Sequence, residues 1–154
     1  MGFMDRQREV YAQMAAHMQS LLAPGEVMHG VIVANQQKTF SMTLYLVATT
    51  DRRIIMQPVD RKWQPTGAPL SFGPNDISNT SVWGWAHDAA SRTEKVATFL
   101  GTSGDRIKFE AGGVKWKLMT LGGNMLENVL ATDSQLDGLN AFISFLAAAD
   151  PRGR

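Results

Sequence analysis

Three histidines are the side chains of this sequence best suited to acid–base or metal chemistry, and their positions favour neither. His17, His29 and His87 fall on different predicted elements, and no pair has the spacing with which a helix or strand holds zinc. Asp88 follows His87 and could orient its imidazole, but no nucleophile elbow accompanies the pair. The absence of cysteine excludes thiol catalysis, disulfides and thiolate metal ligands. We therefore expect a non-enzymatic protein without a metal site.

Two glycine-containing segments are the candidates for phosphate or cofactor binding. They are Gly101–Gly104 and Leu121–Asn124. Neither is followed by the lysine of a phosphate-binding loop, and neither has the strand–loop–helix spacing of a dinucleotide site. Both segments are predicted to be turns, and no cofactor is expected.

Cations beside a tryptophan form the first candidate contact surface. Arg61 and Lys62 directly precede Trp63 in a predicted loop. Lys38, in another predicted polar loop, is the fourth residue of this candidate surface. A tryptophan flanked by cations suits a membrane interface or the centre of a protein contact. The alternative is that Trp63 covers the rim of its own domain.

A row of cations on two predicted strands forms the second surface, a candidate face for an anionic ligand. The row consists of Arg106, Lys108, Lys115 and Lys117. These residues alternate with apolar ones, so they share the outward face. Glu110 offsets only one of the facing cations, and a merely solvated face is the alternative. The aromatic residues of these strands point to the opposite face, which argues against a nucleic-acid platform.

The composition describes an ordinary globular chain of one domain. Its 154 residues are 44% hydrophobic and 19% charged, and a formal net charge of +1 gives no reason to expect nucleic acid. Charged residues within positions 1–10 argue against a signal peptide, and no run of about 18 apolar residues predicts a transmembrane segment. Since the chain also lacks cysteine, we expect a cytoplasmic protein.

The first periodic segment, Asp5–Leu22, predicts an amphipathic helix that Pro24 and Gly25 end. Its apolar stripe is the candidate association surface and contains Val10, Met14, Met18 and Leu21. Methionine packs adaptably and suits a partner surface. The stripe either packs on the protein's own body or pairs with another chain, and a symmetric dimer is the commonest result of such pairing.

From residue 26 onward the hydrophobic period changes to two, which predicts strands. A polar loop is expected at Asn35–Ser41, a tight hairpin at Thr50–Arg53, and a break at Gly73–Asn75 within one extended segment. Residues 133–149 predict a closing helix with a strong apolar stripe, in which Gly138 costs about 1 kcal/mol relative to alanine. The predicted strands are 27–33, 42–49, 53–59, 70–85, 94–100, 106–110 and 114–118.

The hairpin at Gly112-Gly113 permits a register prediction. A two-residue turn, favoured by glycine at both positions, matches apolar faces with apolar faces. A three-residue turn would mismatch them. The preferred register sets Phe109 opposite Trp116, Glu110 opposite Lys115 and Lys108 opposite Lys117.

Three short segments resemble the bacterial pleckstrin-homology-like families: Leu22–Glu26 with its Pro-Gly-Glu, Leu46–Ile55 with its Thr-Asp-Arg-Arg, and Ile77–Val82. The resemblance implies an antiparallel β-barrel or sandwich of about seven strands whose C-terminal helix plugs one end. It also implies a scaffold that binds protein or lipid without catalytic residues, and loops at Lys38 and Trp63 that open at the same end. Relatives that bind phosphoinositides carry several cations in the first loop, where this chain has only Lys38.

The predicted organisation is a helix at residues 1–23, a pleckstrin-homology-like domain at 24–150 and a disordered tail at 151–154. The predicted function is protein–protein interaction or self-association through this scaffold. Peripheral binding to anionic lipid is the first alternative. A barrel that binds a small ligand, or an enzyme without a recognisable motif, is the second.

Overall fold

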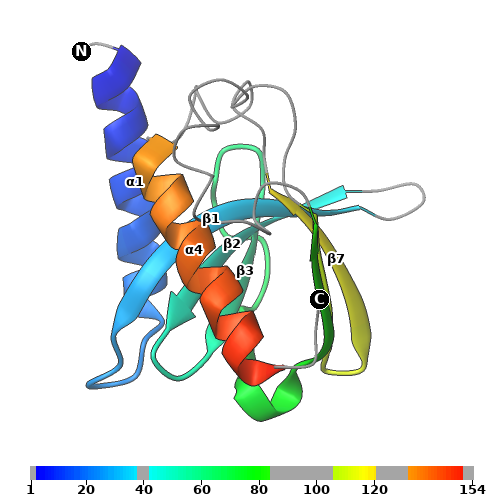
Figure 1. The fold of residues 1–154 in the computed structure, drawn as a ribbon. Helices are drawn as coiled ribbons and strands as arrows, with labels where there is room; N and C mark the ends of the chain where they lie inside the picture. Colours follow the sequence, from blue (N-terminus) through cyan, green and yellow to red (C-terminus); the bar gives the residue numbers. More distant parts are fainter. Residues whose placement is uncertain (1–2, 38–41, 84–105, 121–131, 151–154) are drawn as a thin grey trace.

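The structure, a computed structural model, describes residues 3–37, 42–83, 106–120 and 132–150 and is mainly antiparallel β-structure with two long helices (Figure 1). The elements are α1 (Phe3–Ser20), β1 (Met28–Gln37), β2 (Met42–Thr50), β3 (Ile54–Val59), β4 (Leu70–Phe72), the 3-10 turn η1 (Pro74–Asp76), β5 (Ser78–Trp83), β6 (Arg106–Ala111), β7 (Val114–Thr120) and α4 (Thr132–Ala149). The predicted strand 94–100 and the predicted tail 151–154 lie outside the described residues.

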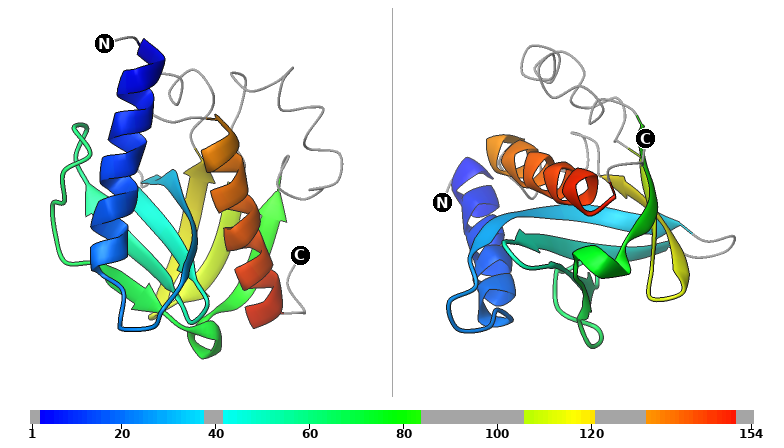
Figure 2. Two further views of the ribbon diagram at one scale, coloured as in Figure 1. Left: turned by 90° about the vertical axis from the view of Figure 1, so that its left-hand side faces the viewer. Right: turned by 60° about the horizontal axis from the view of Figure 1, so that its bottom comes forward.

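The strands form one open, seven-stranded antiparallel sheet in the order β4-β3-β2-β1-β7-β6-β5. The sheet bends so that its two halves, β1–β4 and β5–β7, face each other across a shared core (Figure 2). This arrangement, with a helix at each end of the chain, confirms the predicted fold class, a mainly β pleckstrin-homology-like sandwich. Because β4 and β5 do not pair with each other, the described strands form a sandwich and not a closed barrel.

The main core lies between the two halves and is completed by α4. Leu139, Phe142 and Leu146 of α4 are buried in it, and the ring of Phe142 meets that of Phe109 edge-on with centroids 6.1 Å apart. On the far side, Trp116 of β7 packs edge-on against Tyr45 of β2 with centroids 5.6 Å apart. Side chains therefore fill the space between the two halves, which are joined only at the β1–β7 ladder among the described strands.

A second core lies on the outer face of β1–β3, where α1 covers the sheet (Figure 2). Met14 and Met18 of α1 are buried against Val31 and Val33 of β1. The intervening Ile32 points into the main core instead. Since β1 is covered by a helix on both faces, its side chains are buried at consecutive positions rather than alternate ones.

Two strand predictions are corrected by this arrangement. The loop expected from Asn35 begins later, because Asn35 and Gln36 pair with β2 on one side and β7 on the other. The extended segment 70–85 is two strands: β4 and β5 lie at opposite edges of the sheet, and the predicted break becomes η1 between them. The extension of β1 was missed because Asn35 and Gln36 are polar, although they lie in a central strand. The crossing of the chain from one sheet edge at β4 to the other at β5 has no local sequence pattern.

Both predicted hairpins are confirmed. Thr50–Arg53 connects β2 to β3, and Gly112 and Gly113 have φ of +61° and +77°, as their two-residue turn requires. The β6–β7 register has each of the three predicted residue pairs. Val114, expected on the core face, is instead 44% exposed, because it lies at the tip of the hairpin beyond the covered part of the core.

A glycine pair explains how closely α4 approaches β1. A Cβ atom on Gly30 would lie 2.6 Å from the Cα of Gly138, and one on Gly138 would meet the carbonyl group of Val31 and, at 2.9 Å, the Cγ2 of Ile32. Helix backbone and strand backbone are therefore in direct contact. This contact offsets the low helix propensity of Gly138.

We expect Gly138→Ala to lower the free energy of unfolding by about 1–3 kcal/mol, because overpacking outweighs the gain in helix propensity. Chemical denaturation measures the change. Ser144→Ala, on the exposed side of α4, is the control and should be neutral or slightly stabilising. A Gly138→Ala chain more stable than the parent would contradict the close contact.

Candidate binding surfaces

A buried ion pair holds together the segments that frame the sheet. The carboxylate of Glu26, whose side chain is 1% exposed, accepts hydrogen bonds from Arg53 Nε at 2.9 Å and Arg53 Nη2 at 2.8 Å. Thr50 Oγ1 donates to it at 2.7 Å and the N–H of Ala23 at 2.9 Å. The Arg53 guanidinium also donates to the carbonyl of Leu21 and to the hydroxyl of Ser71 in β4. This one ion pair thus links the end of α1, the β2–β3 hairpin and β4.

The neighbouring turn residues complete this junction. Gly25 has φ of +80°, which allows the chain to turn before Glu26. Val27 exchanges two hydrogen bonds with Asp51: its N–H donates to Asp51 Oδ1 and its carbonyl accepts from the N–H of Asp51. The Pro-Gly-Glu and Thr-Asp-Arg-Arg segments therefore contact each other directly. The sequence singled out both segments but not their pairing.

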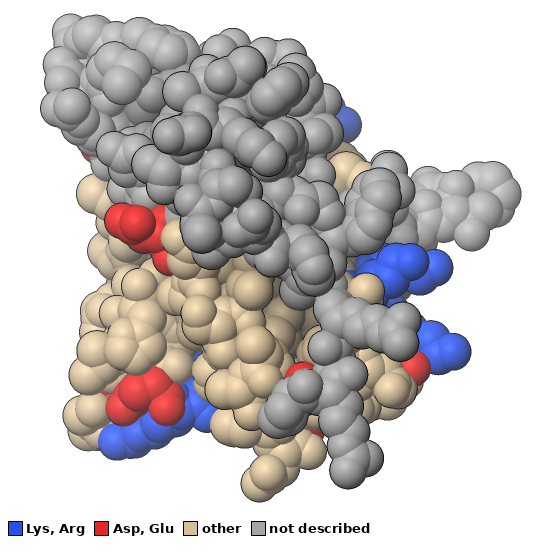
Figure 3. Space-filling view, in the orientation of Figure 1, with Lys and Arg blue, Asp and Glu red and all other residues tan. Residues whose placement is uncertain are grey.

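The lysine face is defined as the exposed outer face of β6 and β7 with Lys108, Lys115 and Lys117, and it contains most of the predicted row of cations. In Figure 3, Lys and Arg side chains project at the side of the molecule where β7 lies. Lys108 lies directly opposite Lys117, and among the described residues neither forms an ion pair. Lys115 lies opposite Glu110. Arg106 pairs with Met119 in the same ladder. The three lysines therefore lie together with Glu110 on one face, and in one facing pair neither lysine forms an ion pair with a described residue.

A β-bulge in β5 shapes the border of the lysine face. Ser78 pairs with Glu110 but Ser81 pairs with Lys108, so β5 has one extra residue there. Asn79 takes a φ of +52° in this bulge, and its Nδ2 donates to Glu110 Oε2 at 2.8 Å. The bulge therefore shifts the alternation of β5 beyond Ser78.

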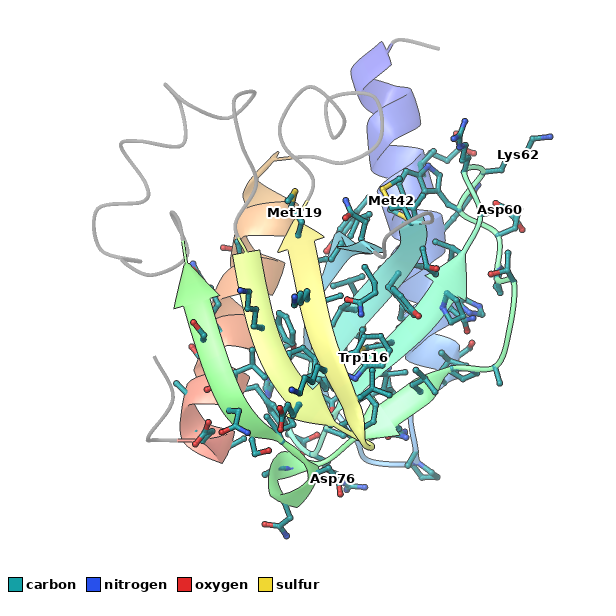
Figure 4. The ribbon with its side chains drawn as sticks, turned by 90° about the vertical axis from the view of Figure 1, so that its right-hand side faces the viewer. Met42, Asp60, Lys62, Asp76, Trp116 and Met119 are labelled. Atoms are coloured by element: carbon teal, nitrogen blue, oxygen red, sulfur yellow. The ribbon has the colours of Figure 1, made fainter. Side chains whose placement is uncertain are left out.

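The loop-end surface, defined as Met42, Arg61, Lys62 and Trp63, lies at one end of β2 and β3 (Figure 4). Asp60 Oδ1 accepts hydrogen bonds from the N–H groups of Lys62 at 2.8 Å and Gln64 at 3.0 Å. This turn exposes both cations and holds Trp63 at φ +66°, half-buried against the core under α1.

The remaining predicted members of these surfaces are placed as follows. The interpretation of Trp63 as a cover for its own domain fits its packing better than a freely exposed interfacial ring. Lys38 lies outside the described residues. Met42, 46% exposed, was missed, since an apolar residue beginning a strand looks like core in the sequence.

The apolar stripe of α1 packs within the chain. Met14 and Met18 are buried, and Val10 and Leu21 are half-buried against the same core. Of the two alternatives, the structure has the stripe packed on the protein's own body, where sheet residues cover it. Association through Val10, Met14, Met18 and Leu21 stays a prediction that requires the helix to leave this position.

Within the described residues no group of three or more histidine, cysteine, aspartate and glutamate side chains is arranged to hold a metal ion. No helix in the same part of the chain is long and apolar enough to cross a membrane. His87 and Asp88 lie outside the described residues.

The sequence matches no protein-family model and no curated protein. Among solved structures, the fold is similar to the hSac2 domain of the human phosphoinositide phosphatase Sac2, with a TM-score of 0.50 and 9% sequence identity. The alignment covers 93% of this chain and 81% of that one. This likeness supports the fold alone, and membership of the bacterial pleckstrin-homology-like families stays a prediction.

The hydrogen bonds of Glu26 produce a first prediction. Donation from Arg53, with further donation from Thr50 and Ala23, lowers the Glu26 pKa from 4.5 to about 2 against the opposing effect of burial. A lowered folded-state pKa stabilises the fold fully above pH 4.5, and the contribution is lost as pH falls toward 2. Glu26→Gln should therefore cost about 3 kcal/mol at pH 7 and remove this acid dependence, measured by urea unfolding across pH. Glu9→Gln, on the exposed side of α1, should do neither.

The facing charges produce a second prediction. Lys108→Glu places a carboxylate opposite Lys117 and should raise the free energy of unfolding by about 0.2–1 kcal/mol. Lys115→Glu places it opposite Glu110 and should lower the free energy by a similar amount. Denaturant unfolding at low salt measures both. A shift in the same direction for the two variants would contradict the pairing.

Proposed function

We propose that this chain is a non-enzymatic binding module that holds an acidic protein partner on its lysine face. The observation that supports this most directly is the exposed Lys108–Lys117 pair, in which two lysines lie directly opposite each other and neither forms an ion pair with a described residue. Like charges directly opposite each other destabilise a sheet. An acidic ligand would convert that repulsion into attraction.

The position of this face also supports the proposal. The outer surface of β1–β3 is covered by α1, whereas Lys108, Lys115 and Lys117 on the outer surface of β6–β7 are exposed. The side chains behind them, Phe109 and Trp116, are buried in the core and fix the strands against the rest of the sheet. Binding to a surface on ordered strands costs little reorganisation, and charge complementarity speeds association.

A second candidate function is peripheral binding to an anionic membrane through the loop-end surface. The observation that favours it is Met42, an exposed apolar side chain at the same end as the exposed cations Arg61 and Lys62 (Figure 4). An apolar residue beside cations suits the boundary between lipid headgroups and acyl chains.

One pair of variants tests both candidates. Binding of the full chain to poly-L-glutamate is measured by calorimetry over a range of salt, and binding to phosphatidylcholine vesicles with and without phosphatidylserine is measured by sedimentation. We expect salt-sensitive binding to the polymer that falls at least about tenfold in Lys108→Glu/Lys117→Glu. The control Arg61→Glu/Lys62→Glu has the same change of charge and should bind the polymer like the parent.

In the vesicle experiment Arg61→Glu/Lys62→Glu is the test variant and Lys108→Glu/Lys117→Glu is the control. Binding to anionic vesicles that only the Arg61/Lys62 variant loses would favour the membrane candidate. No binding to the polymer, or equal loss in both variants, would contradict the proposed role of the lysine face.

A further inference from the structure

Lys108 and Lys117 are held at the closest spacing that two facing strands allow. The N–H of Lys117 donates to Gln36 Oε1 at 2.8 Å, on the side of β7 away from β6, so Lys108 and Lys117 form a non-hydrogen-bonded pair. The Cα atoms of such a pair lie about 4.5 Å apart, compared with about 5.5 Å in a hydrogen-bonded pair. Both side chains are exposed, so their ammonium groups can reach the same point above the sheet.

A serine extends this pair into a row across three strands. Ser81 of β5 lies directly opposite Lys108 in the β5–β6 ladder, so Ser81, Lys108 and Lys117 follow one another across the outer face. Ser81 is half-buried, and its hydroxyl can donate a hydrogen bond. The row therefore offers two cations and a neutral donor to one small group.

The neighbouring row on the same face already contains a negative charge. Lys115 lies opposite Glu110, which in turn lies opposite Ser78. Asn79 Nδ2 donates to Glu110 Oε2 at 2.8 Å and holds this carboxylate beside the bulge. A carboxylate brings one charge, as Glu110 does opposite Lys115. The Lys108–Lys117 pair has two charges, so a ligand with two negative charges on one group balances it better.

We infer that Lys108 and Lys117, with Ser81 beside them, bind the phosphoryl group of a phosphoserine or phosphothreonine side chain on the protein partner. This inference rests on the proposed function and names the acidic group that the lysine face recognises. A phosphoryl group carries nearly two negative charges at neutral pH and has three acceptor oxygens. Each ammonium group and the serine hydroxyl can therefore donate to an oxygen of its own, and such charge-assisted hydrogen bonds are stronger than those between neutral groups.

The surroundings of the pair favour a protein segment over a lipid headgroup as the source of the phosphoryl group. A surface that binds membranes needs apolar side chains that enter the acyl boundary. Among the described residues the exposed large apolar side chains are Val27, Met42, Leu70 and Val114. Of these only Val114 is in β6 or β7, and it has the strand parity of the buried Trp116, not of the lysines.

The test measures binding of synthetic peptides with blocked ends to the full chain by calorimetry near neutral pH. The first peptide has one phosphoserine in a neutral sequence of glycine and alanine. The second has two adjacent glutamates at that position, and the third has an unmodified serine. We expect the phosphoserine peptide to bind about tenfold more tightly than the two-glutamate peptide, because both charges and three acceptors lie on one group. The serine peptide should show no measurable binding.

Protonation of the phosphoryl group gives an independent readout. Its second pKa is about 6, so it carries nearly two charges above that pH and one below it. Binding of the phosphoserine peptide should therefore weaken about fivefold between about pH 7 and about pH 5. The two-glutamate peptide, with pKa values of about 4.3, should bind almost equally at both.

Variants that remove single groups locate the site. Lys108→Gln and Lys117→Gln should each weaken binding of the phosphoserine peptide about tenfold, and Ser81→Ala about threefold. Lys115→Gln should weaken it no more than about threefold, because this lysine acts only through the field of the face. Arg52→Gln, at an exposed cation of the β2–β3 turn, is the control and should leave binding unchanged. Circular dichroism checks that each variant is folded.

The outcomes separate this inference from the proposed function. If neither the charged peptides nor poly-L-glutamate bind, the proposed function fails. If the phosphoserine and two-glutamate peptides bind equally, or if Lys115→Gln costs as much as Lys117→Gln, the lysine face binds acidic chains without selecting a phosphoryl group, and the inference is overturned. It is also overturned if vesicles containing a phosphatidylinositol monophosphate bind more tightly than the phosphoserine peptide and Lys117→Gln abolishes that binding.

Discussion

The buried pair of Glu26 and Arg53 is the interaction on which the frame of this fold depends. Removing two charges from water costs several kcal/mol, and a buried pair is tolerated only when hydrogen bonds satisfy the remaining lone pairs and protons. Here the carboxylate accepts from Arg53, Thr50 and Ala23, and the guanidinium also reaches Leu21 and Ser71. The end of α1, the entry to β1, the hairpin and the edge strand β4 therefore share one anchor. Losing Arg53 would leave the buried Glu26 carboxylate without its ion-pair partner, and losing Glu26 would leave the partly exposed Arg53 without its own, so these elements are coupled.

This anchor has a consequence for the distribution of surfaces. With α1 held against the outer face of β1–β3 and α4 in contact with β1 through Gly30 and Gly138, the first half of the sheet is covered on both sides. Apolar residues on both faces of β1 follow from that arrangement. In contrast, the second half has a buried inner face and exposed lysines on its outer face. The first half of the sheet is therefore covered by both helices, and the proposed binding surface lies on the second half.

The sequence predicts the fold class and both tight hairpins because these depend on local chemistry. Two glycines at 112 and 113 allow the turn, and matching of apolar faces selects the register. The sequence also places the lysines on one face, since a strand alternates with period two. Features set by distant contacts were missed or misplaced. Asn35 and Gln36 look like loop residues but pair with strands on both sides, and no local pattern marks the extra residue in β5. The partner of Glu26 is 27 residues away along the chain, so no local pattern marks it.

Trp116 is the side chain that closes the space between the two halves of the sandwich. It contacts Tyr45, Phe72 and Phe109 and so packs β7 against β2 and β4. A smaller residue would leave the core underfilled. Lys115 and Lys117, on either side of Trp116 along β7, are exposed because a strand directs successive side chains to opposite faces. The residue that closes the core therefore also positions the strand that carries the lysine face.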